Sequence, residues 1–203
     1  NLSAHWTLVL AIITAATLLV GNVTAVFQQS VKRMLAYSSI AQAGFMLFAV
    51  LAVNSFAWQG IIIYAVAYSV ATIGLFAVLV KMKDYTYDGF NGLAKKDPML
   101  AFVTTIFLFS LAGIPLTGGF MAKYYVLLAV VQQGQLMWLV IFALLMAAIS
   151  VYYYFRVIMA MYFKPGTPEL SSPVTAGDRV MLVITCTIII LLGIAPQLFL
   201  TNV

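Results

Sequence analysis

Lys123 is the residue of this sequence whose type and setting point most clearly to chemistry. It is the only charged side chain in the almost continuously apolar stretch from Pro98 to Val131. An ammonium group near the centre of a bilayer costs about 3 kcal/mol or more, so such residues are rare outside functional sites. A lysine held away from water also gives up its proton more readily, and nearby charge and water then decide whether it is protonated. We therefore predict that Lys123 stores and transfers protons.

The same stretch contains residues that interrupt helices. It is too long for one membrane helix of about 20 residues, and its middle holds Gly113, Pro115, Thr117, Gly118 and Gly119. Glycine frees the backbone, and proline removes a hydrogen-bond donor. We predict two half-helices joined by an unwound hinge near residues 113–119. Irregular backbone at membrane depth is tolerated where it is buried in protein or lines a wet cavity, and interrupted spans mark ion and substrate sites in transporters.

Other polar side chains recur at helical spacing in neighbouring apolar segments. Ser38 and Gln42 are four residues apart, and Tyr64, Tyr68 and Thr72 repeat the same spacing. Each set therefore lies on one helix face. In lipid such groups either bond within the protein or line a hydrated path. We predict that they form, together with Lys32, a proton path to Lys123, while the structural alternative stays open for each.

Six apolar segments must position these residues. They run from about 6–27, 34–53, 58–80, 98–131, 137–162 and 180–199, and each is long enough to cross a bilayer. With 65% hydrophobic and 7% charged residues and a mean hydropathy of +1.10, the chain is not a soluble domain. We predict an all-α polytopic transmembrane bundle, in which residues 1–203 form a single domain with six spans and the fourth is discontinuous.

The charges indicate how the chain crosses the membrane. Nine of the ten Lys and Arg residues lie at or near connections on one side, and only Lys123 does not. The positive-inside rule makes that side cytoplasmic. All five acidic residues lie in the same connections, so Lys123 would exchange protons with neutral groups, with water or with something outside this chain.

The sequence contains none of the common cofactor motifs. It has no G-x-G-x-x-G after a strand, no P-loop, no H-E-x-x-H and no C-x-x-C, and its single cysteine and single histidine are Cys186 and His5. We expect no cofactor or metal site in this chain and no nucleic-acid partner, because the net charge of +5 reflects topology. The chain begins with Asn1 rather than methionine, and we expect it to be part of a longer polypeptide.

Three stretches resemble the antiporter-like subunits of respiratory complex I. Residues 31–40, VKRMLAYSSI, resemble the K-R-L-L-A-Y-S-S-I signature of these subunits. Residues 110–127, which hold the hinge and Lys123, are similar to the broken-helix motif of the N-type subunit of bacterial NADH:quinone oxidoreductase, and residues 151–157 resemble its next helix. The resemblance implies the C-terminal six helices of a fourteen-span protein, half of an antiporter-like inverted-repeat fold. It also makes Lys123 the lysine of the second broken helix.

The resemblance implies a proton-translocating subunit of the complex I membrane arm, coupled to NADH oxidation by quinone. NAD, FMN, iron–sulfur clusters and quinone are then expected in partner subunits, and the other membrane-arm subunits and lipids are the expected partners. The expected location is the plasma membrane of a bacterium, with the mitochondrial inner membrane as the alternative. Many relatives carry histidine where this chain has Gln42. A multisubunit Na⁺/H⁺ antiporter subunit and a scaffold that moves no ions remain alternative interpretations.

Overall fold

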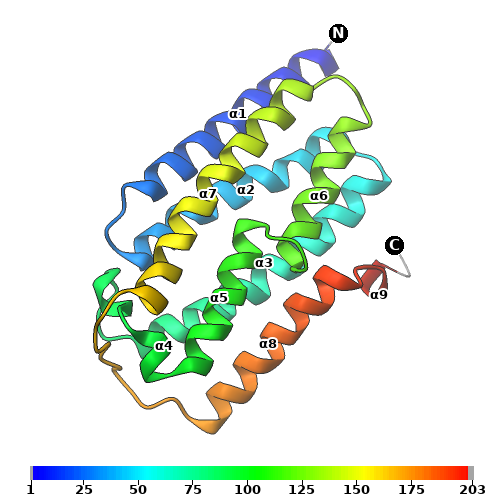
Figure 1. Cartoon of the computed structure of the whole chain (residues 1–203). Coiled ribbons are helices and arrows are strands. Elements are labelled where there is room, and N and C mark those ends of the chain that lie inside the picture. Colours follow the sequence, from blue (N-terminus) through cyan, green and yellow to red (C-terminus); the bar gives the residue numbers. More distant parts are fainter. Residues whose placement is uncertain (1, 201–203) are drawn as a thin grey trace.

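The computed structural model describes residues 2–200, and side chains from residue 5 onward. Seven helices form the body: α1 (Leu2–Val26), α2 (Val31–Ala52), α3 (Ser55–Lys81), α5 (Pro98–Ala112), α6 (Gly118–Val131), α7 (Met137–Phe163) and α8 (Ala176–Ile194). Three short helices lie in connections or at the end of the described chain: η1 (Asp88–Phe90), α4 (Leu93–Lys96) and α9 (Gln197–Leu200). The predicted all-helical class is confirmed (Figure 1).

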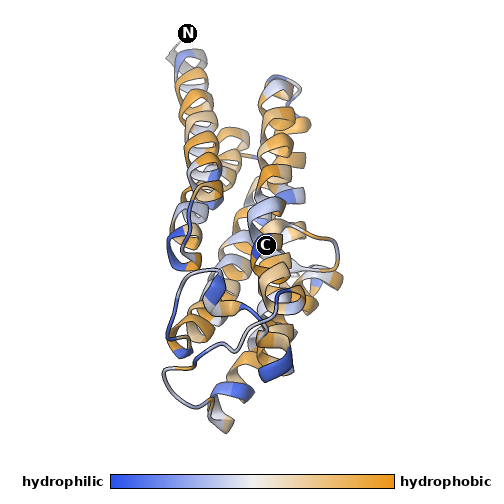
Figure 2. Ribbon diagram, turned by 60° about the vertical axis from the view of Figure 1, so that its left-hand side comes forward, coloured by the Kyte–Doolittle hydropathy of each residue, from blue (hydrophilic) through white to orange (hydrophobic). Residues whose placement is uncertain are grey.

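Within the described residues, five helices are long and apolar enough to cross a membrane. These are α1 from His5 onward, α2, α3, α7 and α8, and α5 is a shorter apolar helix. Figure 2 shows hydrophobic residues along the helices and hydrophilic residues mainly at helix ends and in connections. Large apolar side chains such as Ile12, Ile73 and Ile141 face outward, which suits contact with lipid or with other membrane-embedded protein.

The helices pack into one bundle, in which α2 contacts α1, α3 and α6. Helix α1 contacts α2 and α7, as Figure 1 shows, while α3 contacts α6, α5 and α8. Fully buried small residues such as Ala11, Ala25, Ala71 and Ala143 lie at these contacts. Small side chains let helix backbones approach closely. The resulting van der Waals contacts help helices to associate where the surroundings are as apolar as the core.

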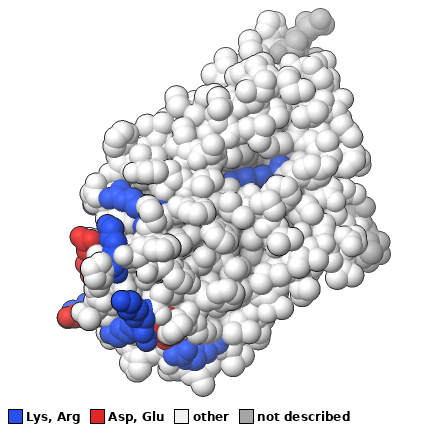
Figure 3. Space-filling model, viewed as in Figure 1, with Lys and Arg blue, Asp and Glu red and all other residues white. Residues whose placement is uncertain are grey.

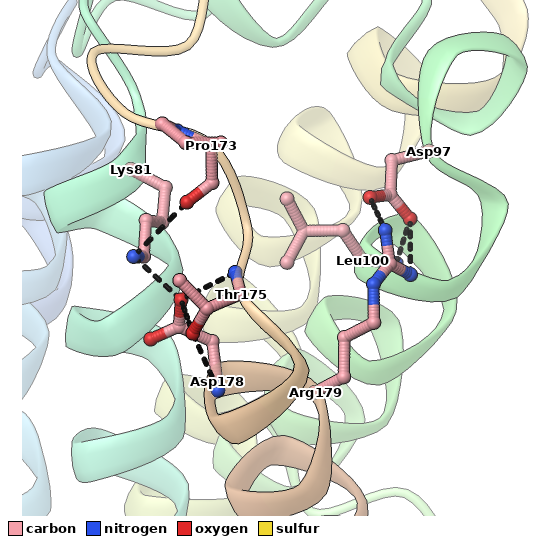
Figure 4. A network of polar contacts seen from close by, with 7 residues as sticks. All are labelled: Lys81, Asp97, Leu100, Pro173, Thr175, Asp178 and Arg179. Atoms are coloured by element: carbon pink, nitrogen blue, oxygen red, sulfur yellow. Dashed lines mark hydrogen bonds and ion pairs between the residues drawn. The ribbon is translucent and has the colours of Figure 1, made fainter.

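The charged residues tie the connections together at one end of the bundle. Figure 3 shows basic and acidic groups gathered there. The ammonium of Lys81 lies 2.6 Å from the Asp178 carboxylate, and Arg179 lies 2.7 Å from Asp97 (Figure 4). Asp97 also caps α5 by accepting a hydrogen bond from the Leu100 amide, 3.0 Å away. These pairs fasten the start of α8 to α3 and α5.

Helix boundaries differ by a few residues from the sequence-based ranges, and the differences at the hinge and at the end of α8 have clear causes. The unwound hinge is Gly113–Thr117, because Gly118 and Gly119 already belong to the first turn of α6. Helix α8 ends at Ile194 rather than near Phe199. Ala195 precedes Pro196 and has an extended φ of −134°, since the residue before proline is disfavoured in the helical conformation.

Candidate functional site

The hinge begins where Gly113 ends α5. Gly113 has a φ of +85°, and its amide donates to the Phe109 and Ser110 carbonyls. Thr117 then leads into α6, and its hydroxyl donates to the Ile114 carbonyl at 2.7 Å. Gly119 lies so close to α5 that a Cβ there would lie 1.8 Å from the Ser110 carbonyl oxygen. The hinge therefore folds the start of α6 tightly against the end of α5.

Lys123 reaches back from α6 to the end of α5. Its Nζ donates to the Leu111 carbonyl at 2.9 Å and to the Ala112 carbonyl at 3.0 Å, and lies 4.7 Å from the centroid of the Phe45 ring. The last carbonyls of a helix have no partner within it and carry about half a negative charge together. The interruption thus creates the acceptors that make a buried ammonium tolerable at this depth.

A fully hydrogen-bonded amide stands beside this lysine. Gln42 on α2 donates to the same Leu111 carbonyl at 3.0 Å and to the Tyr154 hydroxyl on α7 at 3.2 Å. Its amide oxygen accepts from the Tyr64 hydroxyl on α3. All three side chains are buried. The Leu111 carbonyl of α5 is therefore shared by Lys123 and Gln42. Through these two side chains and their partners, α2, α3, α6 and α7 join one network at the end of α5.

A cavity of about 320 Å³ opens beside Lys123. Apart from the lysine, its wall is mainly apolar and aromatic, with Phe45, Leu127, Val140 and Leu144 among its members. Figure 3 shows a basic group in a hollow of the surface, surrounded by uncharged residues and well apart from the charged groups at the lower left. All five acidic residues lie at the charged end, so no carboxylate in the described chain pairs with Lys123.

The structure brings most of the predicted path residues together. Ser38 lies one turn from Gln42, with its hydroxyl bonded to the Leu35 carbonyl at 2.7 Å. Tyr68 and Thr72 line small crevices next to Ser38 and Gln42. Lys32 is not part of this cluster, because it is exposed near the charged end with its ammonium 5.2 Å from the Tyr85 ring centroid. Pro115 lies in the hinge, away from the hydrogen bonds of Lys123.

Sequence reasoning missed two features of this site. Tyr154 is fully buried and accepts from Gln42, and the Ser38 and Tyr153 hydroxyls lie close to its own. Tyr153 in turn donates to Asn22 on α1 at 3.0 Å. The run Tyr152–Tyr154 offered three equivalent candidates, and an isolated asparagine in an apolar helix was the only available signal for Asn22.

The described residues contain no group of three or more His, Cys, Asp or Glu side chains that could hold a metal ion. The donors and acceptors around Lys123 are instead neutral hydroxyls, one amide and backbone carbonyls. Such groups hydrogen-bond to water and can relay protons through it. The arrangement is therefore suited to moving a proton, and Lys123 is the group within it that is able to change its charge.

Comparisons with known proteins agree on one family. The model described as NADH:quinone oxidoreductase/Mrp antiporter, transmembrane, matches residues 1–150. NADH-quinone oxidoreductase subunit N of Trichlorobacter lovleyi is 42% identical over 97% of this chain and 42% of its own length. A chain of respiratory complex I from Thermus thermophilus superposes with a TM-score of 0.85 and 33% identity, over 95% of this chain and 44% of that one. A chain of the Mrp complex from Dietzia shares the fold, with a TM-score of 0.85 and 19% identity over 96% of this chain and 45% of that one.

Proposed function

Because this chain belongs to the NADH:quinone oxidoreductase/Mrp antiporter transmembrane family, we propose that it forms part of a proton-translocating subunit of a bacterial NADH:quinone oxidoreductase. It spans less than half the length of the curated relatives that it matches. The observation that carries the proposal is the buried ammonium of Lys123 on the end of an interrupted helix. We propose further that residues 1–203 form one transmembrane unit with six crossings, of which α5 and α6 together make the interrupted one.

In this proposal Lys123 alternates between a charged and a neutral form. When charged, it is held by the Leu111 and Ala112 carbonyls and the Phe45 ring. Water entering the adjacent cavity can take its proton, and the amine then keeps weaker bonds to the same carbonyls. Since the Gln42 amide also bonds to Leu111, a change of charge on the lysine alters a network that reaches three other helices.

The remaining path residues connect this site toward the charged end. Ser38, Gln42, Tyr64, Tyr68 and Thr72 supply hydroxyl and amide groups along α2 and α3, and Lys32 marks the charged end where protons enter. The positive-inside rule makes that end cytoplasmic. We therefore propose uptake from the cytoplasm of a bacterium and release on the other side of its plasma membrane.

Coupling to electron transfer is electrostatic in this scheme. NAD, FMN, iron–sulfur clusters and quinone belong to partner subunits, and charges that change in neighbouring membrane-arm subunits shift the protonation of Lys123. Such coupling requires only that each charge state of one site favours a different state of the other.

A second function deserves a test because the Mrp-type fold is shared. In an Na⁺/H⁺ antiporter the same lysine would exchange protons against sodium without NADH. Dependence on NADH and quinone, and the presence of the full-length subunit in an NADH-oxidising assembly, distinguish the two functions. Exchange driven by a sodium gradient in the absence of NADH would favour the antiporter.

The direct experiment measures NADH-driven proton pumping in membrane vesicles that carry the full-length subunit with Lys123→Met. We expect reduced pumping in an assembled complex. The matched control is Lys164→Met, which removes an exposed lysine at the end of α7 and leaves pumping unchanged. Wild-type pumping by assembled Lys123→Met complexes would contradict the proposal and favour a scaffold that moves no ions.

A further inference from the structure

Tyr68 and Thr72 differ from the other polar residues of the site because their hydroxyls bond to no described residue. Ser38, Ser39 and Thr104, by contrast, each donate to a carbonyl of their own helix. Both residues are half-buried on α3, one helical turn apart. Away from bulk water, an unpaired hydroxyl costs on the order of 1–3 kcal/mol. Something outside the protein chain is therefore expected to bond to them.

Two small crevices flank Tyr68. The first, which we call the Gln42 crevice, has Gln42, Tyr64, Tyr68 and Ser110 as its polar wall. The second, the Ser38 crevice, has Ser38, Ser39, Tyr68 and Thr72. In each crevice, the centre of a water-sized sphere can occupy about 10 Å³. That is close to the lower limit for one water molecule, which also needs two to four polar partners.

The polar walls offer both kinds of hydrogen-bonding group. The Ser110 hydroxyl accepts from the Gly119 amide at 3.0 Å, so its own hydrogen is free to donate. The Ser38 and Ser39 hydroxyls donate to the Leu35 carbonyl, so their oxygens keep lone pairs that can accept, although that of Ser38 also lies close to the Tyr154 hydroxyl. Tyr68 and Thr72 can do either. Each crevice therefore meets the requirement in polar partners as well as in size.

We propose that each crevice binds one water molecule and that the Tyr68 hydroxyl passes protons between them. This inference rests on the proposed function, since it names the steps of the path to Lys123. In the transfer, an excess proton that has reached the water in the Ser38 crevice passes to the Tyr68 oxygen as the tyrosine's own proton passes to the water in the Gln42 crevice, which then carries the excess proton. The hydroxyl then rotates back, so no net charge remains on the tyrosine.

The order of the two crevices along the bundle fits the transfer of protons from the charged end toward the middle of the bundle. At about 1.5 Å per residue, Thr72 lies about 14 Å and Tyr64 about 26 Å from Lys81 at the end of α3. The Ser38 crevice is therefore nearer the charged end, and the Gln42 crevice is deeper. Leu111, whose carbonyl binds Lys123, lines both crevices, and the Gln42 crevice is also lined by Ala122, the residue before Lys123.

The test combines Tyr68→Phe and Thr72→Val in the full-length subunit within its assembled complex. Both changes keep the shape of the side chain and remove the hydroxyl. The matched controls are Tyr162→Phe, an exposed tyrosine on α7, and Thr187→Val, an exposed threonine that bonds its own helix. We expect Tyr68→Phe to lose most NADH-driven pumping, Thr72→Val to lose part of it, and the controls to pump like the wild type. A high-resolution map of the unmodified complex should show water density in both crevices.

Two results would overturn the inference. One is wild-type pumping by assembled Tyr68→Phe complexes, and the other is a map that resolves ordered water elsewhere in the subunit but none in the crevices. The map decides the matter if the variant does not assemble. Reduced pumping by Lys123→Met with normal pumping by Tyr68→Phe would refute only the water path, whereas normal pumping by both would refute the proposed function itself.

Discussion

At the scale of residues, the helix interruption and the buried lysine compensate for one another. The end of α5 leaves carbonyls without partners, and Lys123 donates to two of them. The ammonium in turn avoids the cost of an unpaired charge. Gln42 adds a third hydrogen bond at the same place. The capping role of Lys123 and its proposed proton transfer therefore depend on the same atoms, and experiments must separate them.

Tyr154→Phe tests how strongly the Gln42 amide depends on its partners. The change leaves one N–H group of Gln42 without its acceptor, at a cost of about 1–3 kcal/mol, and frees the amide to turn away from Leu111. We expect a lower thermal stability of the subunit in lipid nanodiscs and slower NADH-driven pumping. Tyr152→Phe, which changes an exposed neighbour on the same helix, is the control. Equal stability and pumping in the two variants would argue against a role for Tyr154.

At the scale of elements, helix α8 holds the hinge in place. A Cβ added at Gly193 would lie 2.4 Å from the Leu116 carbonyl carbon and oxygen and from the Thr117 amide nitrogen. Leu116 itself has a φ of +71°, a conformation that costs on the order of 1 kcal/mol or more for a residue with a side chain. The hinge is therefore held in a strained shape by a close backbone contact that only glycine permits.

Replacement of Gly193 by alanine should displace the hinge and with it the carbonyls that bind Lys123. We expect a lower melting temperature and reduced pumping in the Gly193→Ala subunit. Gly177→Ala on the same helix is the matched control, because its Cβ would meet nothing nearer than 3.8 Å. That change should be neutral or slightly stabilising, since alanine favours helix more than glycine does. A Gly193→Ala protein indistinguishable from Gly177→Ala would show that the contact does not matter.

The elements were easier to predict from the sequence than the contacts of the site. Apolar length and the Gly and Pro residues near position 115 indicated the interrupted helix, and spacing on one helix face brought together Ser38 with Gln42. The inward face of α7 was not identified, because the helix is apolar and aromatic on nearly all sides apart from Ser150 and Arg156, so Tyr154 was missed. The Leu111 carbonyl could not be predicted as an acceptor for another reason. It is a backbone group, and it lacks a helical partner only because the hinge ends α5 there. Lys32 shares a motif with the path residues, yet its position at the start of α2 keeps it at the charged end.

At the scale of the whole molecule, the charged end fastens the bundle while the opposite end carries no ion pair among the described residues. The carboxylate of Asp97 serves twice, as the cap of α5 and as the partner of Arg179. The Lys83 and Glu169 side chains form a more exposed pair in the loops, where the ammonium lowers the pKa of the Glu169 carboxyl. Exposed pairs of this kind contribute little to stability.

Asp97→Ala should lower the free energy of unfolding by about 1–2 kcal/mol through loss of the helix cap, with a further loss from the unpaired Arg179. Asp97→Asn keeps a side chain that can cap α5 and removes the charge, so it separates the two effects. Glu169→Ala is the control and should leave the melting temperature nearly unchanged, because both partners of its pair are exposed. Equal melting temperatures for Asp97→Ala and Glu169→Ala would show that Asp97 does not fasten the bundle.

The central claim is that Lys123 works by changing its charge and not only by capping α5. The most direct measurement is the number of protons pumped per NADH oxidised by assembled complexes carrying Lys123→Gln beside Lys123→Met. The glutamine amide can still donate to the carbonyls at the helix end, but it cannot gain or lose a proton at physiological pH. We predict that both variants lower the ratio. A normal ratio in Lys123→Gln together with a lowered ratio in Lys123→Met would contradict the account and make Lys123 a structural cap.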